Sequence, residues 1–326
     1  MTTKADTSTP PLPHDDIKLW RVLYAVFGLL AFALQDALIK DMSVTYPVLQ
    51  LLTIRSLIVL LTIATLALLI GGFRLLKTSR PGLLMIRGVF AFCAFTLYYI
   101  ALSKLPLADG AAIYMTAPLF VTALSVPLLG EQVGVHRAAA VMTGFIAAII
   151  MISPGSSIFQ AAAVLPLFSA MLYAFIPVIN RHIGLREHPL TMGVYTMLSY
   201  MILSALAGIL IHTQDWGVSD THLFADIFRH WRPMATGDTI LITFSGLLFV
   251  AGLLGLTQAY RLLPVSIVAP FEYSYLVWAT AIGYVAFTEV PQLRTIIGGL
   301  VIVLCGCYIA LRESHNAKPA TKDTLS

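Results

Sequence analysis

The sequence predicts an all-α integral membrane protein with ten transmembrane helices, arranged as two inverted five-helix repeats. Three observations lead to this fold class. Of the 326 residues, 58% are hydrophobic and only 11% are charged, against about 25% charged in soluble domains. Most apolar segments have about the length that a helix needs to cross a bilayer, roughly 20 residues. A stretch near the middle of the chain also recurs near its end, which indicates an internal repeat.

The apolar segments follow one another with short polar connections between most of them. The fifth segment is the shortest, at about 16 residues, and ends at a Ser-Pro-Gly run that is typical of a chain break. We expect spans at residues 19–39, 47–71, 82–103, 108–130, 138–153, 161–180, 190–212, 237–258, 264–288 and 293–311.

The internal repeat is clearest in the fourth and ninth spans. Residues 106–131 and 264–289 both begin with Pro, both end on Glu, and are offset by 158 residues at both ends. Within the second copy, Glu272 lies about 12 Å along the helix, at roughly 1.5 Å per residue. Its counterpart in the first copy is Tyr114. An internal repeat in a chain with many spans is typical of transporters, whose site lies between the repeats.

The distribution of Lys and Arg predicts the orientation in the membrane. With both termini on one side, that side holds fourteen of these residues and the other side holds five, so the positive-inside rule puts both termini in the cytoplasm. Five spans per repeat is an odd number, so the two repeats must cross the membrane in opposite senses. The expected parts are an N-terminal tail at 1–18, a first repeat at 19–153, a second repeat at 161–312 and a C-terminal tail at 313–326.

The composition argues against several functional classes. A net charge of +4 fits a bias in the loops and does not indicate nucleic-acid binding. All eight histidines lie in loops, tails or span ends, and the three cysteines lie in apolar runs, so we expect no metal site, no disulfide and no cofactor. No G-x-x-x-x-G-K-[ST] motif for ATP binding occurs. A secondary transporter is the favoured function, and an integral membrane enzyme such as an acyl or lipid transferase is the alternative.

Glu272 is the main candidate site residue. A carboxylate is costly in hydrocarbon and normally faces a protein interior or a water-filled cavity. In a functional role it would bind a cationic or hydroxyl group of the substrate, or take up a coupling proton. In a structural role it would pair with an arginine such as Arg55 or Arg87.

Other polar side chains within the spans are candidates for lining the same cavity. Each tyrosine among them has packing as its alternative role, since aromatic side chains also fill helix interfaces. The expected substrate-binding set is Glu272, Tyr275, Tyr114, Tyr99, Tyr173 and Gln258.

Two further charges lie inside the spans, Asp36 in the first and Arg55 in the second. Both are towards the outer side of the membrane, so we expect them to form a structural or gating ion pair rather than to contact substrate. Arg87 lies close to the cytoplasmic end of its span, where extension of the side chain towards the interface would explain it.

The spans carry motifs that resemble a known family. The fourth and ninth spans close with LLGE at 128–131 and FTE at 287–289, and the first span reads GLLAFALQDALIK and ends in Lys40. The second span reads PVLQLLTIRSL and contains Arg55, and the sixth reads FSAMLYAFIPVINRHI. In combination these resemble the drug/metabolite transporter superfamily with EamA-like repeats, over residues 19–312.

The resemblance implies a ten-helix transporter with a central cavity that moves a small organic metabolite. The superfamily includes exporters of amino acids and toxic compounds, and importers of vitamins and of cofactors such as S-adenosylmethionine. Many members have an apolar stretch where this chain has PFEYSYLVW, and we connect that polar and aromatic content with the chain's own substrate.

The expected mechanism is alternating access, in which the two halves rock against each other around the central cavity. Proton coupling through Glu272 and facilitated exchange both remain open. The expected partners are a small-molecule substrate, a coupling proton in the first case, and the lipid bilayer. We expect a monomer or homodimer in the cell (inner) membrane, with no nucleic-acid partner.

Overall fold

The computed structural model describes residues 19–73, 77–130, 134–152, 158–183, 187–213, 223–263 and 265–316, and within these ranges every regular element is a helix. The longer elements follow the expected spans closely, as expected for segments that must satisfy all backbone groups internally within lipid. The helices are α1 (Leu19–Ser43), α2 (Val48–Gly71), α3 (Pro81–Leu102), α4 (Leu107–Tyr114), α5 (Ala117–Leu129), α6 (Val135–Ile152), α7 (Ile158–Ile183), α8 (Pro189–His212), α9 (Ala225–Phe228), α10 (Thr236–Leu262), α11 (Val265–Glu272), α12 (Ser274–Phe287) and α13 (Leu293–Asn316).

Ten crossings of a membrane account for these helices. Within the described residues, nine helical segments are long and apolar enough to cross a bilayer, with α4 and α5 together counted as one of them. The tenth is the pair α11 and α12, separated by Tyr273. The protein is therefore an all-α, multi-pass membrane protein, as the sequence predicts.

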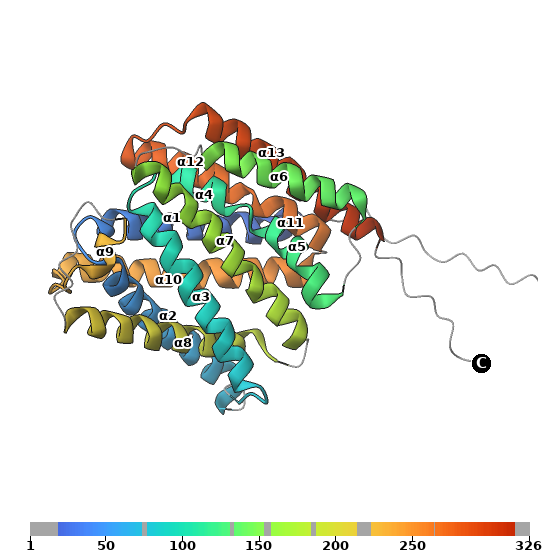
Figure 1. The fold of residues 1–326 in the computed structure, drawn as a ribbon. Coiled ribbons are helices and arrows are strands. Elements are labelled where there is room, and N and C mark those ends of the chain that lie inside the picture. The colour runs from blue at the N-terminus through green and yellow to red at the C-terminus, as the bar shows by residue number, and fades with distance from the viewer. Residues whose placement is uncertain are drawn as a thin grey trace, which may run out of the picture.

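The packing of the helices has an approximate two-fold pattern (Figure 1). Each principal contact has a counterpart when the helices of the two halves are matched in order. The matched helices are α1 with α7, α2 with α8, α3 with α10, α4–α5 with α11–α12, and α6 with α13. Thus α1 packs on α10 as α7 packs on α3, and α2 packs on α10 as α8 packs on α3, while α2 packs on α8 and α6 on α13. This is the pattern expected of two inverted repeats, whose boundaries at 19–153 and 161–312 stay a prediction.

The fourth and ninth crossings are both broken at equivalent positions. Residues 115–116 separate α4 from α5, and Tyr273, which lies 158 residues after Met115, separates α11 from α12. The crossings also end alike, because the backbone is left-handed at Gly130 (φ 69°) and at its counterpart Thr288 (φ 57°). Two interrupted helices at matching positions of the repeats mark the binding region in many transporters.

The contact between α1 and α10 is a close approach of backbones. A Cβ atom added at Gly28 would lie 3.1 Å from the carbonyl oxygen of Gly252, and one added at Gly255 would lie 2.9 Å from the carbonyl oxygen of Tyr24. Small residues allow this kind of packing between membrane helices, where no hydrophobic force drives helices together. The glycines therefore fix one helix of each repeat against the other.

The segment around α9 covers one end of the bundle, at the left of Figure 1. Arg229 donates hydrogen bonds to the carbonyl oxygens of Ser43, Val44 and Thr45, at 2.9 to 3.2 Å. Gln50 exchanges two hydrogen bonds with the backbone of Arg232. The connection between α8 and α10 is thus tied to the turn between α1 and α2.

Arg87 does not extend towards the membrane interface. Its guanidinium donates hydrogen bonds to the Asn180 side chain at 2.8 Å, to the carbonyl oxygen of Met192 at 3.3 Å, and to Thr196. The prediction for Arg87 was wrong, because the side chain ties α3 to α7 and α8. The sequence placed it near a helix end but could not show which face of the helix carries it.

Candidate functional site

Four of the predicted tyrosines belong to one aromatic tract in the centre of the bundle. The ring centroids of Tyr98 and Tyr114 are 4.8 Å apart, those of Tyr114 and Tyr173 are 5.6 Å apart, and those of Tyr98 and Tyr99 are 5.4 Å apart. The tract continues to α12, because the hydroxyls of Tyr98 and Tyr275 are 2.6 Å apart. It thus joins α3 and α4 of the first repeat to α7 and α12 of the second.

Asp36 anchors a buried polar cluster at one end of this tract. Its carboxylate accepts hydrogen bonds from Tyr99 at 2.6 Å, from Tyr275, and from the neighbouring Gln35. All of these side chains are at most 5% exposed. Because a buried charge requires hydrogen-bonding partners, the cluster holds α1, α3 and α12 in a fixed relation at this level.

Arg55 joins the cluster without a direct contact with Asp36. Its guanidinium donates to the hydroxyl of Tyr99 at 2.6 Å and to Gln35 Oε1 at 2.8 Å. It also lies over the rings of Tyr99 and Phe249, at 4.8 and 5.3 Å from their centroids. The structure therefore brings the predicted pair together through Tyr99 and Gln35, and the hydroxyl of Tyr99 uses its one proton on Asp36 while accepting from Arg55 and Gln35.

Glu272 ends α11, immediately before the break in the ninth crossing. Its Oε1 accepts a hydrogen bond from the hydroxyl of Tyr260 at 2.6 Å, and it lies close enough to Tyr173 to interact electrostatically. Arg55 and Arg87, the proposed structural partners, are both engaged elsewhere. The carboxylate is half-buried and keeps unused acceptor capacity, since each carboxylate has about four lone-pair positions.

Gln258 was expected to line the site and forms no hydrogen bond with it among the described residues, whereas Tyr260 was not expected there and does. Gln258 lies half-buried on α10, and no hydrogen bond joins it to the other candidates in the described part of the chain. Tyr260, two residues further on, is not among the residues expected from the sequence, since tyrosines near helix ends commonly sit at the membrane interface. Its position in the last turn of α10 lets its hydroxyl reach Glu272 at the end of α11.

Other kinds of site find little support. Within the described ranges, no group of three or more His, Cys, Asp or Glu side chains could hold a metal ion. A hollow on the surface of α10, lined by residues from Met234 to Leu247, contains none of the candidate residues. The tyrosine tract, with Asp36 and Glu272 beside it, is therefore the candidate site among the described residues.

Residues 19–153 match the family described as "EamA-like transporter family". This match lies in the first half of the chain and agrees with the resemblance to the drug/metabolite transporter superfamily. The chain is 27% identical to a riboflavin transporter of Vibrio cholerae over 89% of this chain and 92% of that protein. It is 28% identical to a pseudopaline exporter of Pseudomonas aeruginosa, over 87% of this chain and 93% of that protein.

Another relative of the EamA-like chain is an S-adenosylmethionine uptake transporter of Rickettsia prowazekii, 24% identical over 75% of this chain and 77% of that protein. A solved crystal structure with 18% sequence identity covers 91% of this chain and 99% of its own, with a TM-score of 0.52, which supports the fold alone. Since the relatives are named as transporters and exporters, the EamA-like chain is a small-metabolite transporter and not an enzyme.

Proposed function

We propose that the protein is a secondary transporter that moves a small organic metabolite across the cell (inner) membrane by alternating access, with both termini in the cytoplasm. Glu272, Tyr114, Tyr173 and Tyr275 contact the substrate, and Tyr99 supports them from the Asp36 cluster. The observation that carries this proposal is the tyrosine tract, because it is built by both repeats and lies where the fourth and ninth crossings are broken.

The chemistry of the site favours a planar solute with a cationic group. Aromatic rings present π faces that stack on planar ligands and attract cations. Among the described residues, Glu272 has the Tyr260 hydroxyl as its hydrogen-bond partner and no cation paired with it, so an ammonium or another donor on the substrate can bind there. Aromatic amino acids and S-adenosylmethionine combine a planar ring with a cationic group, whereas riboflavin has the planar ring system without the cation. The relatives named for S-adenosylmethionine and riboflavin therefore match all or part of this chemistry.

Two modes of coupling are compatible with the same residues. Glu272 can take up a proton when the substrate leaves, because burial without a cationic partner favours the neutral form of a carboxylate. Exchange of one substrate for another, without a proton, needs only the contacts already named. A pH dependence of transport that is lost in Glu272→Gln would support the first mode.

The deciding experiment is a thermal-shift screen of the purified protein against amino acids, vitamins, nucleoside cofactors and polyamines. A ligand that binds only the native state raises its apparent stability by mass action. We expect a hit that is lost in Glu272→Gln and kept in Glu187→Gln, a matched change at a half-buried carboxylate that binds Thr78 and Ser79.

The same pair of variants separates the function from the site. A hit kept in Glu272→Gln would retain the transporter and exclude Glu272 from the binding site. Failure of every ligand class at millimolar concentration, together with no uptake or efflux of these compounds by whole cells, would contradict the proposed substrate range.

A further inference from the structure

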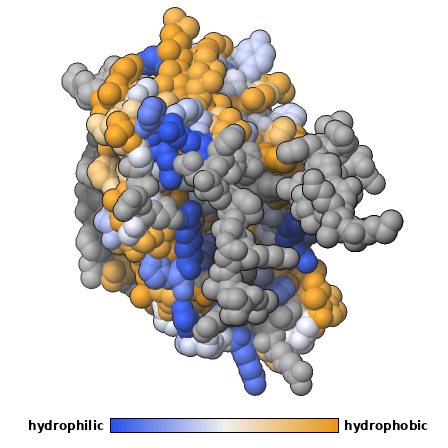
Figure 2. Space-filling view, turned by 90° about the vertical axis from the view of Figure 1, so that its right-hand side faces the viewer, coloured by the Kyte–Doolittle hydropathy of each residue, from blue (hydrophilic) through white to orange (hydrophobic). Residues whose placement is uncertain are grey.

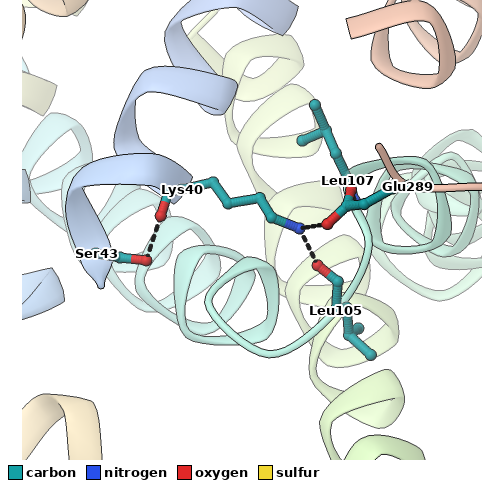
Figure 3. A network of polar contacts seen from close by, with 5 residues as sticks. All are labelled: Lys40, Ser43, Leu105, Leu107 and Glu289. Carbon is teal, nitrogen blue, oxygen red and sulfur yellow. Dashed lines mark hydrogen bonds and ion pairs between the residues drawn. The ribbon is translucent and has the colours of Figure 1, made fainter. Parts of the chain in front are cut away.

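An ion pair joins the two repeats at the end of the bundle that α9 covers. Lys40 Nζ lies 2.5 Å from Glu289 Oε1, as Figure 3 shows. Lys40 belongs to the last turn of α1 in the first repeat, and Glu289 follows α12 in the second repeat. We call this the Lys40 end of the bundle.

The connection between α3 and α4 holds both partners of the pair (Figure 3). Lys40 Nζ donates to the carbonyl oxygen of Leu105 at 2.5 Å, and the backbone N–H of Leu107 donates to Glu289 Oε2 at 2.8 Å. The two side chains are only 12% and 20% exposed. A pair that is shielded and hydrogen-bonded in this way is stronger than a solvent-exposed one, and removing one partner leaves a charge with little solvent around it.

The backbone before Glu289 is strained. Thr288 has a φ of 57°, a left-handed conformation that is unfavourable for a β-branched residue. The first repeat has a glycine, Gly130, at the equivalent position. The turn at Thr288 returns the N–H of Glu289 to the carbonyl oxygen of Gly283 at 3.1 Å, so the strained residue is the one that directs Glu289 towards Lys40.

The ion pair lies over the buried cluster already described. Lys40 is four residues after Asp36, so both side chains are on one face of α1, about one helical turn apart. Asp36 binds Tyr99 of α3 and Tyr275 of α12. Two successive polar layers therefore connect α1, α3 and α12 at the Lys40 end, with the tyrosine tract below them.

The opposite end of the bundle lacks the equivalent closure. At the Lys40 end α4 packs on α12 and on α13. The two-fold relation matches these two contacts with a contact of α11 with α5 and a contact of α11 with α6. Neither pair of helices packs comparably within the described residues. At that end Tyr260, the partner of Glu272, is 36% exposed, and hydrophilic side chains run in a band across the middle of the face (Figure 2).

We propose that Lys40 and Glu289, held by the Leu105–Leu107 segment, form the gate of the transport pathway at the Lys40 end. In this structure the Lys40 end is closed, and the opposite end lacks the corresponding helix contacts within the described ranges. Substrate passes the Lys40 end only when the pair separates. This inference rests on the proposed transport function, but its first test needs no substrate.

The first test measures sided access to a cysteine below the gate. In a background without Cys93, Cys305 and Cys307, Ala37→Cys places a thiol three residues before Lys40, at a buried position. Intact cells are treated with a membrane-impermeant maleimide. Val44→Cys, at a position 79% exposed beside the end of α1, establishes which side of the membrane reaches the Lys40 end.

We expect slow labelling of Ala37→Cys from this side in the parent. In Lys40→Gln and in Glu289→Gln the labelling rate rises by about tenfold or more, because each variant leaves the other charge without its partner. The control variant Glu187→Gln labels as slowly as the parent. Fast labelling in the parent, or unchanged labelling in both gate variants, would overturn the gate.

A charge-swapped variant tests the part assigned to the Leu105–Leu107 segment. In Lys40→Glu with Glu289→Lys the new carboxylate meets the carbonyl oxygen of Leu105 and the new ammonium meets the N–H of Leu107. We expect labelling as fast as in the single variants. Slow labelling would show that the ion pair closes this end without the segment.

A cross-link then connects the gate to transport. A reducible bifunctional thiol reagent across Lys40→Cys and Glu289→Cys should stop transport, and a reductant should restore it, while either single cysteine is unaffected by the reagent. Transport that continues with the cross-link in place overturns the gate. Absence of transport in the parent, with the expected labelling pattern, would contradict the proposed function and leave the gate intact.

Discussion

The two ends of the bundle differ in how their buried polar groups are satisfied. At the Lys40 end, Asp36, Arg55, Tyr99 and Tyr275 bind one another. At the opposite end, Glu272 accepts one hydrogen bond from a partly exposed tyrosine. A polar group whose bonds are complete holds helices together, whereas one with spare capacity can receive a ligand. The cluster at the first end therefore holds α1, α3 and α12 together while the Lys40 end is closed, and Glu272 at the second end keeps acceptor capacity for a ligand.

The largest expected effect is on stability and comes from removing the Asp36 carboxylate at the Lys40 end. Asp36→Ala leaves Tyr99 without its acceptor, leaves Tyr275 only the hydroxyl of Tyr98 as a partner, and leaves Arg55 without a counter-charge. We therefore expect a loss of about 3–5 kcal/mol in the free energy of unfolding. Asp36→Asn keeps one acceptor oxygen and should cost less. Thermal or denaturant unfolding in detergent measures both, and an unchanged stability in Asp36→Ala would remove the structural role of this end.

A smaller effect is expected on ligand binding at Tyr173. Tyr173→Leu removes a ring that lies against Tyr114, and we expect an affinity lower by about tenfold, since an aromatic contact contributes about 0.5–1.5 kcal/mol beyond area. Tyr173→Phe keeps the ring and should bind like the parent. Equal losses in both variants, measured by titration calorimetry, would assign the contact to the hydroxyl instead of the ring.

Removing the Tyr260 hydroxyl should strengthen ligand binding, whereas removing the Tyr173 ring should weaken it. Tyr260→Phe removes the hydroxyl that competes for Glu272, so a cationic ligand should bind more tightly, by about fivefold for a hydrogen bond worth about 1 kcal/mol. A neutral ligand of the same shape serves as the comparison and should be unaffected. Weaker binding of the cationic ligand would mean that Tyr260 itself contacts the substrate.

The smallest expected effect is on the strained turn. Thr288→Gly relieves the left-handed conformation, partly offset by the greater flexibility of glycine, and should stabilise the protein by about 0.5–1 kcal/mol. Thermal unfolding measures the change, and Thr288→Ala, which keeps a Cβ atom, provides the control. A gain of the same size in Thr288→Ala would locate the strain in the side chain and not in the backbone.

The fold was predictable from the sequence because each crossing is a continuous apolar segment and the repeat has a constant offset. The break in the ninth crossing was only partly predictable. Pro270 indicates a distortion of the helix, but the interruption falls at Tyr273, three residues later. Proline removes a hydrogen bond to the preceding turn, and tertiary packing decides where the chain adjusts.

The partners within the site could not be predicted from the sequence. Spacing shows that Glu272 and Tyr275 share a helix, but not which face of α10 turns towards them, so Tyr260 was missed. Lys40 and Glu289 were both noted as ends of motifs, and their contact depends on how α1 and α12 are rotated about their axes. Rotation of this kind is set by packing between helices, which a single sequence does not display.

The close glycine contact between α1 and α10 should determine which helices move together during transport. Contacts between backbones leave no side chains to rearrange, so α1 and α10 are expected to travel as one body, although they come from different repeats. The same holds for α3 and α7, which are joined by the hydrogen bond from Ser169 to the carbonyl oxygen of Ala94 at 2.7 Å. The sequence repeat divides the chain at its middle. The bodies expected to move together instead each combine a helix of the first repeat with a helix of the second.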